Sequence, residues 1–317
     1  MIRLFSIKGT LLTEINFEPA NLESALHQAS WVDALSPTDE ERDVLERLLK
    51  TEVPEADDID EIEDSARCFI DPAGIHVYTL YLTQDENRFD TVSVACILQP
   101  EKLITIREDK LADFRLFCMR AKRGQTEVAS PTELLISLME QKVESLADTV
   151  EDIHTRLESI GATVLNDPAD KPEDIVSLLA NAEDSNGKVR LCLMDTQRNI
   201  SFLQRHLRSS IDVHETSREI AKDIDTLLSH STFLFDKINF LMNFMQGYIS
   251  IQQNQIIKTF SIAAVVFLPP TLVASIYGMN FEIMPELSWT FGYPVAIILM
   301  VLSGIAPYLF FKRKGWL

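Results

Sequence analysis

Two long uncharged segments near the C-terminus dominate the hydrophobic pattern of this 317-residue chain. Residues 261–280 read SIAAVVFLPPTLVASIYGMN and residues 291–311 read FGYPVAIILMVLSGIAPYLFF, and neither contains a charged side chain. About 20 predominantly apolar residues are enough for a helix to cross a bilayer. A buried core helix would explain one such segment, but two in tandem predict a pair of membrane-spanning helices.

The charges around these segments predict their orientation. Lys258 precedes the first segment, Lys312, Arg313 and Lys314 follow the second, and residues 281–290 contain no Lys or Arg. Basic residues accumulate on the cytoplasmic side of membrane helices. We therefore expect both ends of the hairpin in the cytoplasm and the short loop outside.

A heptad-like apolar stripe leads into the first segment, with steps that alternate between four and three residues and one polar interruption at Ser231. Its members are Ile220, Ile224, Leu227, Leu234, Ile238, Leu241, Met245 and Tyr248. This spacing is typical of a coiled coil, and also of an ordinary helix that faces a core. No Pro or strong turn signal occurs at residues 216–268, and this length favours a stalk; if unbroken, one helix would cover residues 216–280.

The same spacing continues into the first membrane segment with smaller and more polar side chains. The positions are Asn254, Ile257, Ser261, Ala264, Leu268, Thr271, Ser275 and Gly278. Several copies of this helix around one axis would line a pore with the stripe, but small residues also mediate ordinary helix packing in membranes. The spacing alone leaves both interpretations open. Pro269 and Pro270 remove backbone donors, and we expect Thr271 to help satisfy a freed carbonyl.

The first part of the chain has the pattern of a mixed α/β domain. Strand-like alternation occurs at residues 2–7, 68–70, 76–82, 91–98 and 102–107, and helical patterns occur at 38–49 and 111–121. Residues 131–160 and 172–210 then have the pattern of long amphipathic helices. We expect an α/β domain followed by a long helical region.

The net charge of −19 lies entirely before the membrane segments, because residues 255–317 carry four basic and two acidic side chains. An acidic body repels the phosphates of nucleic acid, so no nucleic-acid partner is expected. A cationic partner fits this charge, and so does plain solubility. The four cysteines form no CxxC pair, which indicates reduced thiols in a cytosolic body.

Motifs of catalysis are absent from the sequence. The chain has no phosphate-binding glycine pattern and no nucleophile elbow, so we expect that it is not an enzyme. The histidines show no HxxxH or HExxH spacing that would indicate a zinc site; they are His27, His76, His154, His206, His214 and His230.

Several segments of the chain resemble those of the CorA family of magnesium channels. They are YGMN at 277–280, FEIMPEL at 281–287, GYP at 292–294 and FKRKGWL at 311–317. Two more, VVFLPPTLVAS at 265–275 and KVRLCLMDTQR at 188–198, resemble the versions of enteric-type bacterial members. The resemblance covers the whole chain and is less distinctive in its first third.

This resemblance implies an α+β membrane protein that assembles as a homopentamer in the bacterial inner membrane. Residues 1–125 would form a cytoplasmic α/β sandwich and residues 126–257 the long helices of a funnel and stalk. The expected remainder is a pore-lining transmembrane helix at 258–280, an external loop at 281–291, a second transmembrane helix at 292–312 and a basic cytoplasmic tail at 313–317.

The selectivity filter implied by the resemblance is Gly278, Met279 and Asn280. Because Mg²⁺ holds its six waters tightly, we expect the Asn280 amide to bind a water of the hydrated ion. Gly278 would allow an unusual backbone turn with its carbonyl toward the axis, and Met279 would pack under the loop. Glu282 and Glu286 would concentrate cations at the mouth, or be ordinary solvated loop charges.

Below the filter, the resemblance makes Thr271 and Asn254 polar stations and places a hydrophobic constriction at Leu268, Ile257 and Phe260. Ser261, Ala264 and Ser275 complete the expected pore lining. Lys312, Arg313 and Lys314 would anchor at the inner membrane face and ring the pore entrance.

The implied function is Mg²⁺ influx driven by the membrane potential, with Co²⁺ and Ni²⁺ as further substrates and internal Mg²⁺ as the regulatory ion. Glu219, Asp223 and Asp225 are candidate sensor residues, and the acidic run at 52–64 is another candidate. Two alternatives stay open: a transporter of zinc or another divalent cation, and a membrane-anchored cytosolic sensor or scaffold.

Overall fold

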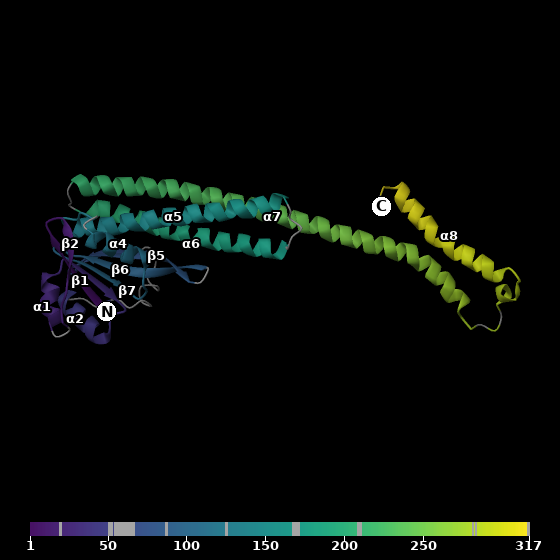
Figure 1. Cartoon of the computed structure of the whole chain (residues 1–317), viewed down its shortest axis with the longest axis horizontal. Coiled ribbons are helices and arrows are strands. Elements are labelled where there is room, and N and C mark those ends of the chain that lie inside the picture. The colour runs from purple at the N-terminus through teal and green to yellow at the C-terminus, as the bar shows by residue number, and fades with distance from the viewer. Residues whose placement is uncertain are drawn as a thin grey trace. The chain divides into compact units, whose positions relative to one another are not determined.

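The computed structural model describes residues 1–18, 21–49, 53, 67–85, 88–123, 126–166, 172–207, 211–280, 282 and 284–315. The chain divides into two compact units, Met1–Met242 and Asn243–Leu317, and helix α7 contributes to both. The elements in Figure 1 are β1 (Ile2–Lys8), β2 (Leu11–Ile15), α1 (Leu22–Gln28), β3 (Trp31–Leu35), α2 (Asp39–Leu49), β4 (Cys68–Asp71), β5 (Gly74–Asp85), β6 (Arg88–Leu98), β7 (Leu103–Arg107), α4 (Ala112–Lys122), α5 (Pro131–Asn166), α6 (Pro172–His206), α7 (Ile211–Tyr277), η3 (Pro285–Ser288) and α8 (Gly292–Arg313).

The first unit is built on a seven-stranded sheet with the order β2-β1-β3-β7-β6-β5-β4. Neighbouring strands are antiparallel except β3 and β7, which are parallel. Five of these strands were expected from their alternating pattern. The two that were not, β2 and β3, are short segments of five residues each.

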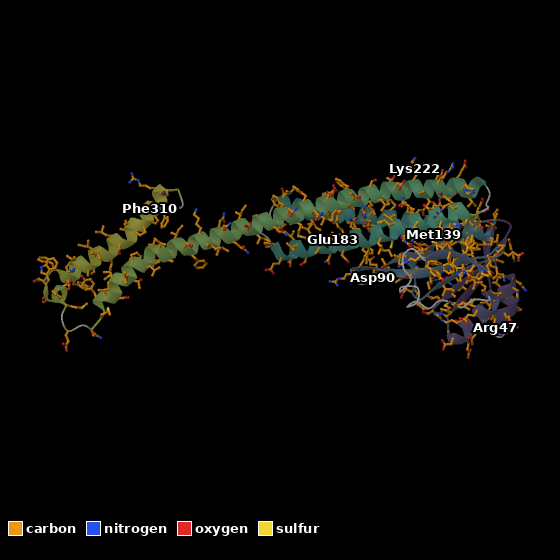
Figure 2. The ribbon with its side chains drawn as sticks, turned by 180° about the vertical axis from the view of Figure 1, so that it is seen from behind. Arg47, Asp90, Met139, Glu183, Lys222 and Phe310 are labelled. Atoms are coloured by element: carbon orange, nitrogen blue, oxygen red, sulfur yellow. The ribbon has the colours of Figure 1, made fainter. Side chains whose placement is uncertain are left out.

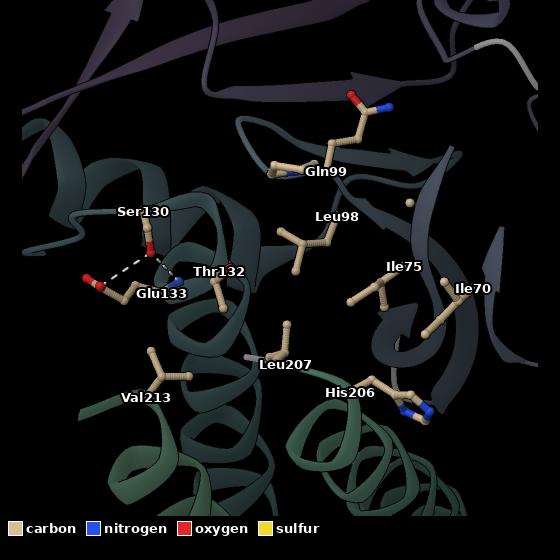
Figure 3. A pocket seen from close by; sticks show the side chains of 12 residues that line it. Ile70, Ile75, Leu98, Gln99, Ser130, Thr132, Glu133, His206, Leu207 and Val213 are labelled. Atoms are coloured by element: carbon tan, nitrogen blue, oxygen red, sulfur yellow. Dashed lines mark hydrogen bonds between the residues drawn. The ribbon is translucent and has the colours of Figure 1, made fainter. Parts of the chain in front are cut away.

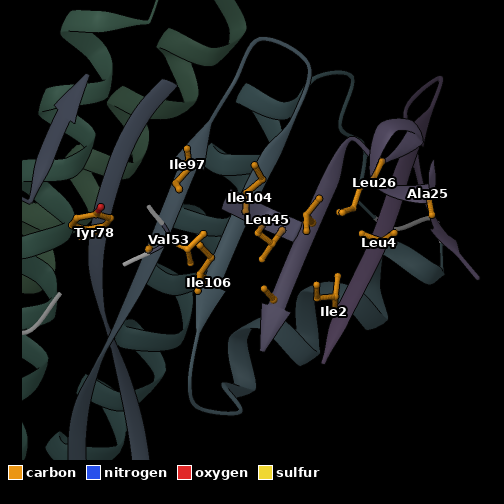
Figure 4. Packing of buried hydrophobic residues seen from close by; sticks show 14 residues of the cluster. Ile2, Leu4, Ala25, Leu26, Leu45, Val53, Tyr78, Ile97, Ile104 and Ile106 are labelled. Carbon is orange, nitrogen blue, oxygen red and sulfur yellow. The ribbon is translucent and has the colours of Figure 1, made fainter. Parts of the chain in front are cut away.

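Helices cover both faces of the sheet, which confirms the expected α/β sandwich (Figure 1). On one face, Leu26 of α1 and Leu45 of α2 belong to a buried cluster with the strand residues Ile2, Leu4 and Ile104 (Figure 4). On the other face, which α4, α5 and α6 cover, the Trp31 ring stacks on Phe5 at 4.7 Å and meets Phe117 edge-on at 5.8 Å. Helix α1 was not predicted.

A buried carboxylate in β3 explains why this strand escaped prediction. Asp33 is fully buried in the middle of the strand, where a charge contradicts the apolar pattern of a core strand. Arg107 of β7 donates to both of its oxygens, at 3.2 and 2.9 Å, and Arg3 of β1 donates at 2.7 Å. The pairing depends on strand neighbours that are distant in sequence, so the hydrophobic pattern alone gives no sign of it.

A second buried polar network joins the sheet to α5 and α6. Asp195 of α6 accepts hydrogen bonds from the Thr79 hydroxyl and the Leu80 N–H of β5, each at 2.8 Å. Lys142 of α5 donates to the same hydroxyl at 2.7 Å, and its ammonium lies 3.5 Å from the Asp195 carboxylate. Because both charges are almost wholly buried, this pair fixes the position of two long helices on the sheet.

The three long helices α5, α6 and α7 pack together inside the first unit. The apolar stripe of α7 supplies buried residues to this bundle at Ile220, Ile224, Leu234, Ile238 and Leu241. A Cβ atom built at Gly161 of α5 would touch Leu241 at 3.7 Å. This part of the stripe therefore packs as the core-facing side of an ordinary helix. The sequence had left this interpretation open beside a coiled-coil stalk, which the length of the run favoured. The expectation of one helix through both prolines is confirmed, and this helix ends at Tyr277.

Replacing Asp195 with alanine should destabilise the first unit strongly. The change leaves Lys142 as a buried charge without its carboxylate, which typically costs about 3–5 kcal/mol. We expect a lower thermal unfolding midpoint of the full-length protein in detergent. Glu183→Gln is the matched control, because Glu183 is an exposed acid on the same helix. Equal midpoints for the two variants would contradict this account of the network.

Candidate ion pathway in the membrane helices

Two helices are long and apolar enough to cross a membrane, by length and composition: the one ending at Tyr277 and α8. Their large side chains are largely exposed, with Phe260, Phe267 and Leu268 of α7 at 73%, 69% and 65%. Figure 2 shows Phe310 projecting from the last turns of α8. Exposed apolar surface of this extent requires a bilayer or a partner chain around it.

The Gly-Met-Asn segment follows directly on the end of α7. The Gly278 N–H donates to the Ala274 carbonyl at 2.9 Å and the Met279 N–H to the Ile276 carbonyl at 3.2 Å, which prolongs the last helical turn. Gly278 is not among the glycines with positive φ. The expected unusual turn at Gly278 is therefore wrong, because the helical hydrogen bonding continues through it. A Cβ there would lie 3.2 Å from the Ala274 oxygen.

Asn280 and Met279 are exposed at the end of this segment, and Met279 has 49% of its surface open. Within the described part of the chain, the Asn280 amide has no hydrogen-bond partner. Its donors and acceptor are therefore available to a ligand or to water. The expected packing role of Met279 stays a prediction.

The predicted pore-lining residues share one side of α7. At about 100° of rotation per residue, Asn254, Ile257, Ser261, Ala264, Leu268, Thr271 and Ser275 fall within one third of the circumference, with Phe260 at its edge. All of these side chains are exposed. The partly buried residues of the segment lie on the opposite side; they are Ile262, Val266, Pro269, Pro270, Val273 and Tyr277. The stripe thus points away from the face that packs inside the second unit.

Helix α8 meets this opposite face at the double proline. A Cβ built at Gly304 of α8 would lie 3.3 Å from the Pro270 ring and 3.5 Å from the Val266 carbonyl oxygen. Because Pro270 has no N–H, the Val266 carbonyl lacks its usual helical donor. The Thr271 hydroxyl donates to the Phe267 carbonyl at 2.7 Å. The expectation that Thr271 satisfies a freed carbonyl is wrong, since the freed groups are those of Val265 and Val266.

The connection after the Gly-Met-Asn segment contains the short helix η3 and returns tightly into α8. The Gly292 N–H donates to the Trp289 carbonyl at 2.9 Å, and a Cβ at Gly292 would overlap the Glu286 carbonyl oxygen. Glu282 and Glu286 are exposed. At the other end of α8, Lys312, Arg313 and Lys314 are exposed, and the Lys314 ammonium lies 5.8 Å from the centre of the Phe310 ring.

The candidate sensor residues separate onto two sides of α7. Asp223 lines a cavity of about 270 Å³ between α5 and α7, together with Glu140 and Glu144. Burial raises the pKa of Glu140, and the charges of Glu144, Glu219 and Asp223 raise it further. Asp225 instead accepts a hydrogen bond at 2.7 Å from Gln197 of α6.

The acidic run at 52–64 lies outside the described residues, except for Val53. Among the residues that the structure describes, no group of three or more His, Cys, Asp or Glu side chains is arranged to hold a metal ion.

Another cavity in the first unit is mostly apolar. It measures about 730 Å³ and is lined by residues such as Ile75, Leu98 and Leu207 (Figure 3). Its polar residues Ser130 and Glu133 hydrogen-bond to each other as a capping box at the start of α5. These groups serve the helix terminus, and their arrangement does not indicate a catalytic site.

The fold and the site define a class: membrane proteins with an α/β domain, a bundle of long helices and a C-terminal hairpin of two membrane helices. The family described as "CorA-like Mg2+ transporter protein" matches residues 27–313. The chain is 44% identical over 319 residues to the magnesium transport protein CorA of Salmonella typhimurium, and equally to that of Escherichia coli K12, with 100% of both chains covered.

A solved structure agrees with these relatives. The complete CorA magnesium transporter from Methanocaldococcus jannaschii superposes with a TM-score of 0.73 at 18% identity, covering 100% of this chain and 99% of that one. At this identity the likeness shows the fold, while the sequence matches show the family. The chain belongs to the CorA family.

Replacing Gly292 with alanine should disturb the loop that follows the Gly-Met-Asn segment. The new Cβ would overlap the backbone of Glu286, and overpacking of this kind typically costs about 1–3 kcal/mol. We expect a lower unfolding midpoint of the full-length protein in detergent. Gly187→Ala is the control, because a Cβ at Gly187 meets no atom within 4 Å. A variant at Gly292 as stable as this control would contradict the close approach.

Proposed function

We propose that this chain forms a channel for Mg²⁺ in the bacterial inner membrane. The observation that carries the proposal is the uncharged Gly-Met-Asn segment at the end of a membrane helix whose polar stripe faces away from its hairpin partner. The relatives named as magnesium transport proteins, with which the chain aligns over its full length, support this assignment.

The chemistry of the ion explains why the filter has no charge. Mg²⁺ is small and sheds its six waters reluctantly, so a passage for the hydrated ion needs neutral hydrogen-bonding groups. The exposed Asn280 amide offers such a group, and five copies around an axis would bind the water shell. Carboxylates would hold the bare ion more tightly and release it slowly.

The homopentamer places the exposed stripe of α7 on the pore axis and α8 outside it. Thr271 and Asn254 are then polar stations, and Leu268, Ile257 and Phe260 form a constriction that closes when water leaves it. Ser261, Ala264 and Ser275 complete the lining. Exposure of these side chains in a single chain is consistent with a partner surface or with lipid.

The membrane potential supplies the driving force. Each elementary charge gains about 2.3 kcal/mol per 100 mV, and Mg²⁺ carries two. We propose that the N- and C-termini lie in the cytoplasm, with Lys312, Arg313 and Lys314 at the inner face; the basic residues at both ends of the hairpin support this orientation. Glu282 and Glu286 then raise the concentration of cations at the outer mouth. The proposed channel therefore requires no other energy source, and we propose no enzymatic activity.

Co²⁺ and Ni²⁺ are proposed as further substrates, because their hydrated ions are close in size to that of Mg²⁺. A zinc transporter of the same family is the second candidate, and the retained Gly-Met-Asn segment disfavours it. A membrane anchor for a cytosolic sensor is the third, and the polar stripe has no evident use in an anchor.

We propose that internal Mg²⁺ also regulates the channel through the acidic surface of α5 and α7. Glu219 and Asp223 raise the pKa of Glu140, which means that the negative charges on these residues repel one another. A bound dication would relieve this repulsion and hold the helices in the closed arrangement. Asp225 faces α6, so its part in the sensor would require a neighbouring subunit.

Asn280→Ala should abolish potential-driven Mg²⁺ uptake into proteoliposomes. Five lost hydrogen bonds of about 1 kcal/mol each exceed the 1.4 kcal/mol of a tenfold change, so uptake should fall at least tenfold. Asn243→Ala on the exposed surface of α7 is the matched control. Uptake that survives in Asn280→Ala would remove this filter, and no uptake by folded wild type with low internal Mg²⁺ would favour the anchored sensor.

Asp223→Asn should weaken the stabilisation of the protein by Mg²⁺. A ligand that binds the folded state raises the unfolding midpoint, and the removal of one carboxylate from the cavity lowers the affinity for a dication. The measurement is the midpoint of the full-length protein in detergent with and without MgCl₂. Asp236→Asn, at an exposed acid of α7, should respond as wild type does, and an identical Mg²⁺ response in Asp223→Asn would exclude Asp223 from the sensor.

A further inference from the structure

Two histidines that are 76 positions apart in the sequence meet between α5 and α7. His154 Nδ1 and His230 Nε2 lie 2.9 Å apart, and the ring centroids are separated by 5.1 Å. Both side chains are partly exposed, so ions in solution can reach them. The spacing of histidines along the chain gave no sign of this pair, because the two residues belong to different helices.

The surroundings of the pair resemble those of a metal-ligating histidine. Such a residue usually presents one nitrogen to the ion and donates its other N–H to a carboxylate. His154 Nε2 lies 3.5 Å from the Glu158 carboxylate, one helical turn further along α5. Without a metal, one of the two facing nitrogens donates its N–H to the other at 2.9 Å, and an ion that binds both nitrogens would displace that proton.

The separation of the two facing nitrogens also suits a single shared ion. A metal ion needs the neutral imidazole. Two nitrogens about 2.1 Å from one ion and at right angles lie about 3.0 Å apart, close to the separation in the structure.

We propose that His154 and His230 form a binding site for divalent transition-metal ions, with water molecules as the remaining ligands. Imidazole nitrogen suits Ni²⁺, Co²⁺ and Zn²⁺, whereas Mg²⁺ prefers oxygen ligands. The site therefore binds these ions in preference to Mg²⁺. It belongs to the first unit, whereas the Gly-Met-Asn segment belongs to the second. An ion bound there crosslinks α5 to α7.

The test is isothermal titration of NiCl₂ into the tag-free full-length protein in detergent. Wild type should bind one ion per chain at this site, and both His154→Gln and His230→Gln should lose it. His206→Gln is the matched control, since the His206 ring bonds to the Phe202 carbonyl of its own helix. Glu158→Gln should weaken binding about tenfold, as outer-shell changes commonly do. A large excess of MgCl₂ should not displace the ion.

Two further measurements keep the outcome decisive. His154→Gln and His230→Gln should keep the Mg²⁺ uptake that Asn280→Ala loses, so failure of the proposed filter and failure of this site are separable. The visible spectrum of CoCl₂ with wild-type protein should change on binding, which needs no variant to fold. Equal Ni²⁺ binding by wild type and both pair variants, or no spectral change with Co²⁺, would show that the two rings form a hydrogen-bonded pair and nothing more.

Discussion

The second unit is governed by one constraint, which is that backbone polar groups in hydrocarbon must find partners inside the protein. Helix α7 meets this constraint along most of its length and departs from it at Pro269 and Pro270. The carbonyls of Val265 and Val266 are freed there, and Gly304 of α8 approaches Pro270 and Val266 closely. The double proline thus marks where α8 packs on α7. Because α8 occupies that side, the polar stripe is left on the other.

The charged residues are concentrated in the first unit, where water can solvate them, and are absent from the segment that lies in hydrocarbon. The first unit carries the acidic surplus of the chain, while residues 261–280 have no charge at all. Where ionised groups are buried in the first unit, they are paired and hydrogen-bonded, as Asp33 is with Arg3 and Arg107. An isolated charge in the same place would be far more costly. The carboxylates near Asp223 are exposed and lie close enough to raise the pKa of Glu140, and a bound cation would relieve their mutual repulsion.

The sequence was most informative where one physical signal acted alone. The membrane helices followed from apolar length, and α5 and α6 from their amphipathic pattern. Strand β3 was missed because Asp33 interrupts its apolar pattern. The buried charge is compensated only by Arg3 and Arg107, which are distant in sequence or lie on other strands. An unusual backbone was expected at Gly278 because glycine permits one, but its φ is not positive and its N–H still makes a helical bond to Ala274 just after α7 ends. The His154–His230 pair was invisible because no spacing rule covers contacts between helices.

The contrast between two kinds of contact inside the first unit has a mechanical consequence. Lys142 and Asp195 tie α5 and α6 to the sheet through directional, buried polar bonds that fit one geometry. Helix α7 meets the same helices mainly through the apolar seam, and hydrophobic contact is non-directional. The sheet, α5 and α6 should therefore move together as one rigid body. Helix α7 is also held by a buried polar contact, in which the Asn186 amide of α6 donates to the Ser231 carbonyl at 3.0 Å, so a shift of α7 along its seam would break that bond.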